Sequence, residues 1–376
     1  MLKRITPELG GIAAKVEANE RLGFEDGLAL YRTRDIQTLG ELANRVRERR
    51  HGNDAYFVVN RHLNPSNICV FTCRFCAFRR APNEAGAYRM SLDEVRRKVL
   101  EEFEGNVTEV HIVGGVDPKL PYRYFIDLVR LIHELRPDIH IKAYTMIEIE
   151  WLSRIGRKSV PEVIEELKEA GLGSCPGGGA EVLAERVHRE LFDKKLDAQR
   201  WLETARAVHA AGLRSNATML YGHIETEAEL VEHMLKVREL QDETGGFLTF
   251  IPLAFHPANT RLSHLPGPSG LQDLRAIAVS RLLLDNIDHI KTYWVMQTLP
   301  LSQIALRYGA DDIDGTVVEE KITHDAGAQT PLGLTREELV AWIREAGRDP
   351  VERDTLYTRL TRARPEEASA SRTGRG

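Results

Sequence analysis

From residue 55 onward, short apolar runs alternate with longer amphipathic stretches, and this alternation constrains the fold more than any other feature of the chain. The apolar runs predict strands at residues 55–59, 108–114, 139–145, 215–221, 247–255 and 289–296. The amphipathic stretches predict helices at residues 91–104, 121–135, 159–170, 198–211, 226–243, 270–288 and 301–308. Strands that alternate with helices lie parallel, which predicts an α/β fold. At least six such units over roughly 250 residues favour a TIM-type (β/α) barrel, closed or nearly closed, over an open doubly wound sheet.

Local signals mark the helix ends and the domain limits. Ser91 and Glu94 have the spacing of a capping box, and Pro161 and Gly171 stand at the start and just past the end of the third predicted helix. Residues 1–50 are helical and amphipathic, so we expect an N-terminal helical cap there, a barrel over residues 51–310 and a C-terminal extension packed on the barrel over residues 311–363. The tail, residues 364–376, has too little apolar content to pack and is expected to be disordered.

Composition and charge argue against several classes of protein. No apolar run is long enough to span a bilayer, and Glu8 and Gly10 stand where a signal peptide needs an apolar core, so we expect a cytoplasmic protein. The net charge of −5 argues against a general affinity for nucleic acid or for an anionic membrane. The motifs H-E-x-x-H, the Walker loop and the nucleophile elbow are missing from the sequence, so zinc hydrolysis, NTP hydrolysis and serine chemistry have no support.

Three of the four cysteines, Cys69, Cys73 and Cys76, form a C-x3-C-x2-C pattern. They follow the first predicted barrel strand, at the end where barrel enzymes keep their active sites. Three thiolates can each hold a different iron of a [4Fe–4S] cluster. The fourth cysteine, Cys175, ends a different predicted strand, so one iron is left open to bind another group. The role of Cys175 itself stays open.

A zinc site or three buried thiols is the simpler alternative. Zinc prefers two C-x2-C pairs or a mixture of cysteine and histidine, and the sequence holds no second pair. His62 could be a fourth zinc ligand, but it precedes the loop, on the strand itself. The spacing therefore favours the open cluster.

This cysteine pattern after the first strand of an α/β barrel resembles that of the radical S-adenosylmethionine (SAM) superfamily. The resemblance implies that the open iron chelates the amino and carboxylate groups of SAM and that an electron from the cluster generates a 5′-deoxyadenosyl radical. The cofactor then carries the hard chemical step, and the protein supplies orientation and a dry cavity. The implied partners are a small-molecule substrate and an electron donor such as flavodoxin or ferredoxin.

The resemblance also implies a set of SAM contacts. Gly114 and Gly115 match the family's glycine pair, which lets backbone approach the methionyl amino group; a plain strand-to-helix turn is the alternative. Phe75 stands at the aromatic position that contacts adenine in family members. Glu181, in the stretch of residues 176–181 that closes the strand ending at Cys175, is a candidate for the ribose or amino group, and Thr145 is a weaker candidate at the same mouth.

Longer segments are similar to the aminodeoxyfutalosine synthases of the futalosine route to menaquinone. They include NRHLNPSNICVFTCRFCAF, TEVHIVGGVDP, CPGGGAE and IPLAFHP. This resemblance implies that the 5′-deoxyadenosyl radical adds to 3-[(1-carboxyvinyl)oxy]benzoate and gives 6-amino-6-deoxyfutalosine, with release of methionine and CO2 or bicarbonate. The alternative is a dehypoxanthine futalosine cyclase or a related radical SAM enzyme that abstracts hydrogen. IPLAFHP, residues 251–257, favours the synthase, because the cyclases carry IPWTFQP there.

The implied substrate carries two carboxylates, so we expect cationic or amide donors in the pocket. His256 is the candidate catalytic residue, because it stands where the synthases and cyclases differ; it would bind a carboxylate or manage a proton. The other candidates for substrate binding, each with a structural role as its alternative, are polar residues at or near strand ends: His62, Arg61, Arg79, Asn216, Tyr221 and Asn259.

Three acidic residues, Asp311, Asp312 and Asp314, could suggest a cation site. Neighbouring carboxylates on a loop flanked by glycine are more often helix caps or solvated turn residues, and that is the role we expect.

Overall fold

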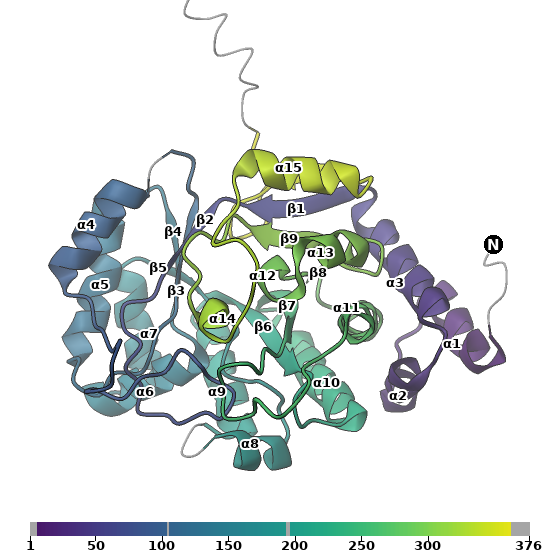
Figure 1. The fold of residues 1–376 in the computed structure, drawn as a ribbon, viewed down its shortest axis with the longest axis horizontal. Coiled ribbons are helices and arrows are strands. Elements are labelled where there is room, and N and C mark those ends of the chain that lie inside the picture. The colour runs from purple at the N-terminus through teal and green to yellow at the C-terminus, as the bar shows by residue number, and fades with distance from the viewer. Residues whose placement is uncertain (1–5, 104, 193–195, 362–376) are drawn as a thin grey trace, which may run out of the picture.

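A seven-stranded parallel sheet forms the centre of the molecule (Figure 1). The structure is a computed structural model that describes residues 6–103, 105–192 and 196–361. The strands follow one another in chain order, and every neighbouring pair is parallel. They are β2 (Asn60–Leu63), β3 (Glu109–Ile112), β4 (His140–Ala143), β5 (Leu172–Cys175), β6 (Arg214–Tyr221), β7 (Phe247–Ala254) and β8 (His289–Ile290). The predicted α/β barrel architecture is confirmed, in an open form of seven strands.

A second sheet fills the gap between β2 and β8. Its order is β10-β1-β9, with β1 at Asp54–Val58, β9 at Asp312–Gly315 and β10 at Asp349–Glu352. Single parallel bridges join Arg61 of β2 to Val318, which follows β9, and Lys291, which follows β8, to Asp312 of β9. Because β1 ends two residues before β2 begins, one extended segment passes from the small sheet into the large one. The predicted strand at residues 55–59 is therefore the centre of the small sheet, and β2 is the strand that leads into the cysteine loop.

Helices cover the outside of the large sheet (Figure 1). Those that alternate with its strands are α4 (Leu92–Glu102), α5 (Tyr122–Leu135), α6 (Met146–Gly156), α7 (Val160–Glu169), α8 (Glu185–Leu191), α9 (Ala198–Ala210), α10 (Glu227–Thr244), α11 (Gly270–Leu283), α12 (Trp294–Gln297) and α13 (Leu299–Ala305). The capping box of α4 is confirmed, since the Glu94 carboxylate accepts from the Ser91 N–H at 2.7 Å and Ser91 Oγ accepts from the Glu94 N–H at 3.2 Å.

Three helices and one strand of the barrel differ from expectation. Helix α6 was not predicted, because it begins directly after Thr145 and its apolar residues continue the strand-like run. Helix α8 was not predicted either. The predicted strand at residues 289–296 is only two residues long and is followed by α12. The indole of Trp294 in α12 donates to the Gly315 carbonyl at 2.9 Å, so this apolar turn packs as a helix against β9.

The two ends of the chain pack on the barrel. Helices α2 (Phe24–Arg32) and α3 (Ile36–His51) lie beside α10 and α11, and α1 (Pro7–Glu17) packs on α2 and α3 (Figure 1). A Cβ at Gly27 would lie 2.9 Å from both Leu283 and Val231, so α2 needs a glycine there to pack this closely. Helices α14 (Ile322–Asp325) and α15 (Arg336–Glu345) follow the barrel. The predicted domain limits are not tested, and the predicted tail lies outside the described residues.

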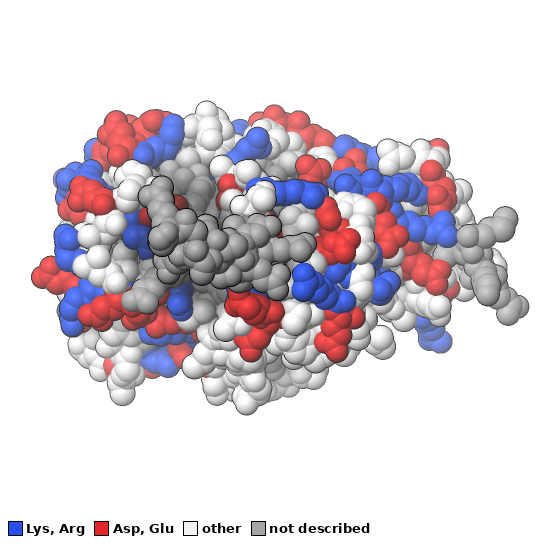
Figure 2. Space-filling model, turned by 90° about the horizontal axis from the view of Figure 1, so that it is seen from above, with Lys and Arg blue, Asp and Glu red and all other residues white. Residues whose placement is uncertain are grey.

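The surface carries charges of both signs. Figure 2 shows Lys and Arg intermixed with Asp and Glu over the visible face, rather than one field of a single sign. Among the described residues, no helix is both long enough and apolar enough to cross a membrane.

Candidate active site

A cavity of about 330 Å³ opens at the carboxyl ends of the large sheet's strands, where α/β barrels place their active sites. Polar residues from most strands of the large sheet and the three cysteines of the loop after β2 line the cavity. Apolar side chains of β7 and of the α14 segment complete the lining. It brings together ten of the predicted site residues: Cys69, Cys73, Cys76, Phe75, Gly114, Thr145, Glu181, Asn216, His62 and His256.

The cysteine loop is held by its own backbone and by Arg79. The Cys69 N–H donates to the Arg80 carbonyl at 3.3 Å, and Arg79 Nε donates to the Cys69 carbonyl at 3.3 Å. The thiols of Cys69, Cys73 and Cys76 are half-buried and line the same cavity wall. Three thiols on one preformed loop, open to a cavity, fit a cluster that keeps one iron free. Arg79 supports this loop and is not among the residues that line the cavity.

The glycine pair presses against the cysteine loop. The Gly115 N–H donates to the Ser66 carbonyl at 2.6 Å, and a Cβ on Gly115 would lie 2.3 Å from the Ile68 carbonyl oxygen. Gly114 lines the cavity, and a Cβ at this position would lie 3.0 Å from the Ser66 carbonyl oxygen. Any other residue at position 115 would push the loop away, so this glycine sets the place of the cysteines.

Two acidic side chains lie at the same mouth. Glu148, which sequence reasoning missed, lines the cavity and accepts from Thr145 Oγ1 at 2.8 Å. The Thr145 Oγ1 also accepts from the Glu148 N–H at 3.4 Å, so this hydroxyl caps α6 directly. Glu181 is buried in the cavity wall, with φ of 49°. A non-glycine residue rarely adopts a positive φ, and such positions concentrate at functional sites. Phe75 lies edge-on to Phe192, with ring centroids 6.1 Å apart.

Besides Arg79, three other predicted substrate residues do not line the cavity. The Tyr221 hydroxyl donates to Asp273 at 2.7 Å and is buried behind the wall. Asn259 is exposed and donates to the Asp325 carbonyl at 2.8 Å, and Arg61 joins β2 to the second sheet. Their contacts are structural, which was the alternative stated for each.

A group of mostly buried polar side chains at the inner end of the cavity was missed, apart from His62 and Asp314. Lys142 lies 2.7 Å from Glu109 and Lys291 lies 2.8 Å from Asp314, each as a buried ion pair. The cavity residues of this group are His62, His111, Lys142, Lys291, Tyr293, Asp314 and Glu320. One signal could have found part of it, since His62, His111 and Lys142 each stand one residue before the end of their strand.

The acidic run after α13 is not a set of solvated turn residues, and that prediction was wrong. Asp311, Asp312 and Asp314 are all buried. Asp311 pairs with Arg281 and Asp312 pairs with Arg353 at 2.5 Å. Cationic side chains from distant parts of the chain neutralise these carboxylates, which is what allows them to be buried.

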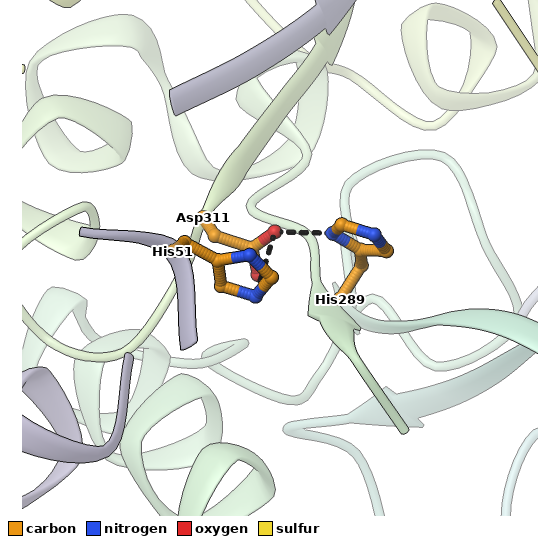
Figure 3. A group of neighbouring side chains, drawn as sticks. All are labelled: His51, His289 and Asp311. Carbon is orange, nitrogen blue, oxygen red and sulfur yellow. Dashed lines mark hydrogen bonds and ion pairs between the residues drawn. The ribbon is translucent and has the colours of Figure 1, made fainter. Parts of the chain in front are cut away.

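Asp311 also lies within reach of two imidazoles, a group that resembles a metal site (Figure 3). His289 Nδ1 is 2.6 Å from Asp311 and His51 Nε2 is 3.6 Å from it. Burial alone would raise the pKa of Asp311, but His289 and the Arg281 guanidinium hold it well below its usual value. The Arg281 guanidinium therefore already balances the charge of the Asp311 carboxylate. The group lies at the amino ends of the strands, away from the cysteines.

Comparison with known proteins agrees with this geometry. Residues 63–237 match the model of the radical SAM superfamily, and residues 244–366 match the CofH/MqnC C-terminal region. The chain is 50% identical to aminodeoxyfutalosine synthase of Thermus thermophilus, over 93% of this chain and 95% of that protein. The chain belongs to the radical SAM superfamily.

Other relatives place this radical SAM chain more narrowly. In Streptomyces coelicolor, aminodeoxyfutalosine synthase is 44% identical over 91% of this chain and 92% of that protein, and cyclic dehypoxanthine futalosine synthase is 36% identical over 94% and 89%. Methylornithine synthase has a similar structure, with a TM-score of 0.67 and 18% identity over 96% of this chain and 99% of that one. At that identity the likeness concerns the fold alone.

Proposed function

We propose that this radical SAM chain is an aminodeoxyfutalosine synthase in menaquinone biosynthesis. It would convert 3-[(1-carboxyvinyl)oxy]benzoate and SAM into 6-amino-6-deoxyfutalosine, methionine and CO2 or bicarbonate. The observation that carries this proposal is the 50% identity to a synthase over nearly the whole of both chains. The cavity supports it, because one space joins three thiols at its mouth to cationic side chains at its inner end.

Cys69, Cys73 and Cys76 would hold a [4Fe–4S] cluster. When bound, the reduced cluster and SAM supply a 5′-deoxyadenosyl radical. Glu181 and Phe75, which line the cavity, would orient the nucleoside part of SAM, and the glycine pair would keep the cysteine loop close to them. Addition of a radical to a double bond requires near-attack geometry and a dry site.

Apolar side chains of β7 and the α14 segment supply the dry wall. Ile251, Leu253 and Phe255 line the cavity from the β7 side, and Ile322 lines it from α14. These hydrocarbon side chains carry no O–H, N–H or S–H group and do not hold water by hydrogen bonds. Their role is to exclude solvent while the substrate rearranges.

His256 would manage a proton. Its Nε2 lies 2.9 Å from the Met296 carbonyl oxygen, which can only accept, so Nε2 is the protonated nitrogen. In the neutral ring Nδ1 is then free to accept a proton as the substrate's aromatic ring is restored. The ring lines the cavity, so this acceptor is within the reaction space.

The second candidate is the cyclase reaction. The 36% identity to a cyclic dehypoxanthine futalosine synthase supports it. The two reactions differ in the fate of the nucleoside. A synthase incorporates the adenosine into its product, whereas a hydrogen-abstracting enzyme releases free 5′-deoxyadenosine. The higher identity to two synthases favours incorporation.

The test is to incubate the reconstituted enzyme with a reductant, SAM and 3-[(1-carboxyvinyl)oxy]benzoate, and to identify the nucleoside by mass. We expect 6-amino-6-deoxyfutalosine as the main nucleoside. Stoichiometric 5′-deoxyadenosine with an unchanged benzoate would contradict the proposal. The proposed electron donor in the cytoplasm is a flavodoxin or a ferredoxin, which replaces the chemical reductant in a second assay.

A further inference from the structure

Three polar side chains form a row across the inner face of the large sheet. His62 in β2 is in register with His111 in β3, and His111 is in register with Lys142 in β4. Residues in register on neighbouring parallel strands point to the same face, and all three of these line the cavity. The two imidazole rings stack, with centroids 4.7 Å apart and planes 3° apart. We name this set the imidazole–lysine row.

The layer beneath the imidazole–lysine row is filled. Asn60 and Glu109 are in register two residues earlier on β2 and β3, and they are 1% and 0% exposed. Glu109 accepts from Thr355 Oγ1 at 2.8 Å and lies 2.7 Å from the Lys142 ammonium. Because this layer is packed and hydrogen-bonded, the cavity ends at the row. The Glu109 carboxylate anchors Lys142 from below.

The His62 ring has no such anchor. It is 8% exposed, and within the part of the chain that the structure describes no hydrogen bond joins either ring nitrogen to the protein. Buried polar groups in proteins nearly always have a partner, so an imidazole left open to a cavity points to a ligand. Burial lowers the pKa of His62 and lowers that of His111 well below its usual value. Both rings are therefore neutral, and each offers one N–H donor.

We propose that the imidazole–lysine row binds a carboxylate of the substrate, an inference that rests on the proposed function. The row presents two imidazole N–H groups and one ammonium, and a carboxylate is the acceptor that takes several such bonds at once. Lys291, whose ammonium lies 2.8 Å from Asp314, lines the same cavity and adds a second cation.

The position of the row selects between the substrate's two carboxylates. The cysteines lie on the loop beyond the end of β2, and the row lies one residue inside that end. The vinyl group must lie on the cysteine side, where it meets the radical, and the enol-pyruvyl carboxylate is attached to it. The benzoate carboxylate is on the far side of the aromatic ring. It is therefore the group that reaches the row.

The experiment compares the substrate with its carboxamide analogue, in which only the benzoate carboxylate is replaced. On the reconstituted enzyme with SAM, calorimetry gives Kd for each compound, and turnover gives KM and kcat. In the wild type we expect the carboxamide to bind about tenfold or more weakly than the substrate. In His62→Leu that ratio falls toward one, whereas His62→Gln, which keeps an N–H donor, restores part of it.

Lys142→Met alone would leave Glu109 buried without its partner, so the matched variant is Lys142→Met with Glu109→Gln. The effect of SAM on the EPR spectrum of the reduced cluster shows that each variant is folded and loaded. The same preference for the carboxylate in the wild type and in all variants would overturn the inference. Failure of the wild type to form 6-amino-6-deoxyfutalosine counts against the proposed function instead, because carboxylate binding is measured separately.

Discussion

A stacked pair of histidines lies at each end of the barrel, but among the described residues only one of the two pairs is hydrogen-bonded to the protein. At the amino ends of the strands, His51 and His289 stack at 4.9 Å, and the Asp311 carboxylate lies beside both (Figure 3). At the carboxyl ends, His62 and His111 stack at 4.7 Å. Histidine pairs of this kind are candidate metal or catalytic groups when they are considered as residue types alone.

Their partners separate them. His51 Nε2 lies 2.8 Å from the Asp288 carbonyl, His289 bonds to Asp311, and Arg281 balances the carboxylate charge. The Tyr357 ring stacks on His289 at 3.5 Å and ties the C-terminal extension to this end. Protein groups take up the hydrogen bonds of His51, His289 and Asp311 at the amino end, whereas His62 and His111 at the carboxyl end face a cavity. Open hydrogen-bonding capacity, rather than residue type, distinguishes the site from the scaffold.

The largest expected effect is the loss of a cluster cysteine. Cys73→Ala should reduce product formation to background, because only two thiolates would remain for the cluster. Iron and sulfide analysis and the mass assay of the nucleoside measure the outcome. Cys175→Ala is the matched control, since this thiol is fully buried, lies outside the cavity lining and has a pKa raised by burial. Turnover by Cys73→Ala at the wild-type rate would contradict the cluster assignment.

The second effect falls on the amino end. Arg281→Met should cost about 3–5 kcal/mol of unfolding free energy, because it leaves Asp311 buried without its cation. Denaturant unfolding of the protein measures the loss. Activity per folded molecule should stay close to wild type, since neither residue lines the cavity. A variant with normal stability and lost activity would place function at this end and break the comparison.

The third effect concerns the carboxyl end away from the cluster. His256→Gln should lower kcat by about 10²-fold or more if the ring acts as a proton acceptor. The measurement is kcat with saturating substrate, beside the SAM-dependent EPR spectrum as a control for cofactor binding. Unchanged turnover and unchanged substrate affinity would remove His256 from the mechanism and leave it as a support for the Met296 carbonyl.

Local signals in the sequence were enough to predict the α/β barrel and to place three cysteines together on one loop. The capping box at Ser91 and Glu94 lies within three residues, and Cys69, Cys73 and Cys76 lie on one loop. Such patterns depend on spacing alone, and spacing is visible in a sequence.

Features that depend on strand register or on distant partners were not predictable. A histidine at position 111 gains meaning only when β3 is paired with β2 and β4. The buried state of Asp311 depends on Arg281, 30 residues away, and that of Asp312 on Arg353, 41 residues away. The division of one extended segment into β1 and β2 likewise follows from its pairing with the chain's last strands.

The smallest expected effects are on the pH dependence of stability, which should differ between the two ends of the barrel. On the cavity side, the bond to Glu320 raises the pKa of His324 to about 9, above its value of roughly 6.5 in the unfolded chain. The folded state therefore binds this proton more tightly, and the resulting stability is complete below pH 6.5 and lost as the pH rises through 9. At the amino end, burial lowers the pKa of His51. That contribution has the opposite sign, since stability is lost as the pH falls below 6.5.

Thermal unfolding of matched variants at several pH values tests this separation. His324→Gln should flatten the decline in Tm between pH 7 and 10 and leave the acid side as in wild type. His51→Gln should flatten the decline below pH 6.5 and leave the alkaline side unchanged. Because α14 carries His324 and supplies the cavity residues Ile322 and Thr323, alkaline loss of this contact should also raise KM for the substrate. The same pH response in both variants would mean that the two ends do not titrate as separate units.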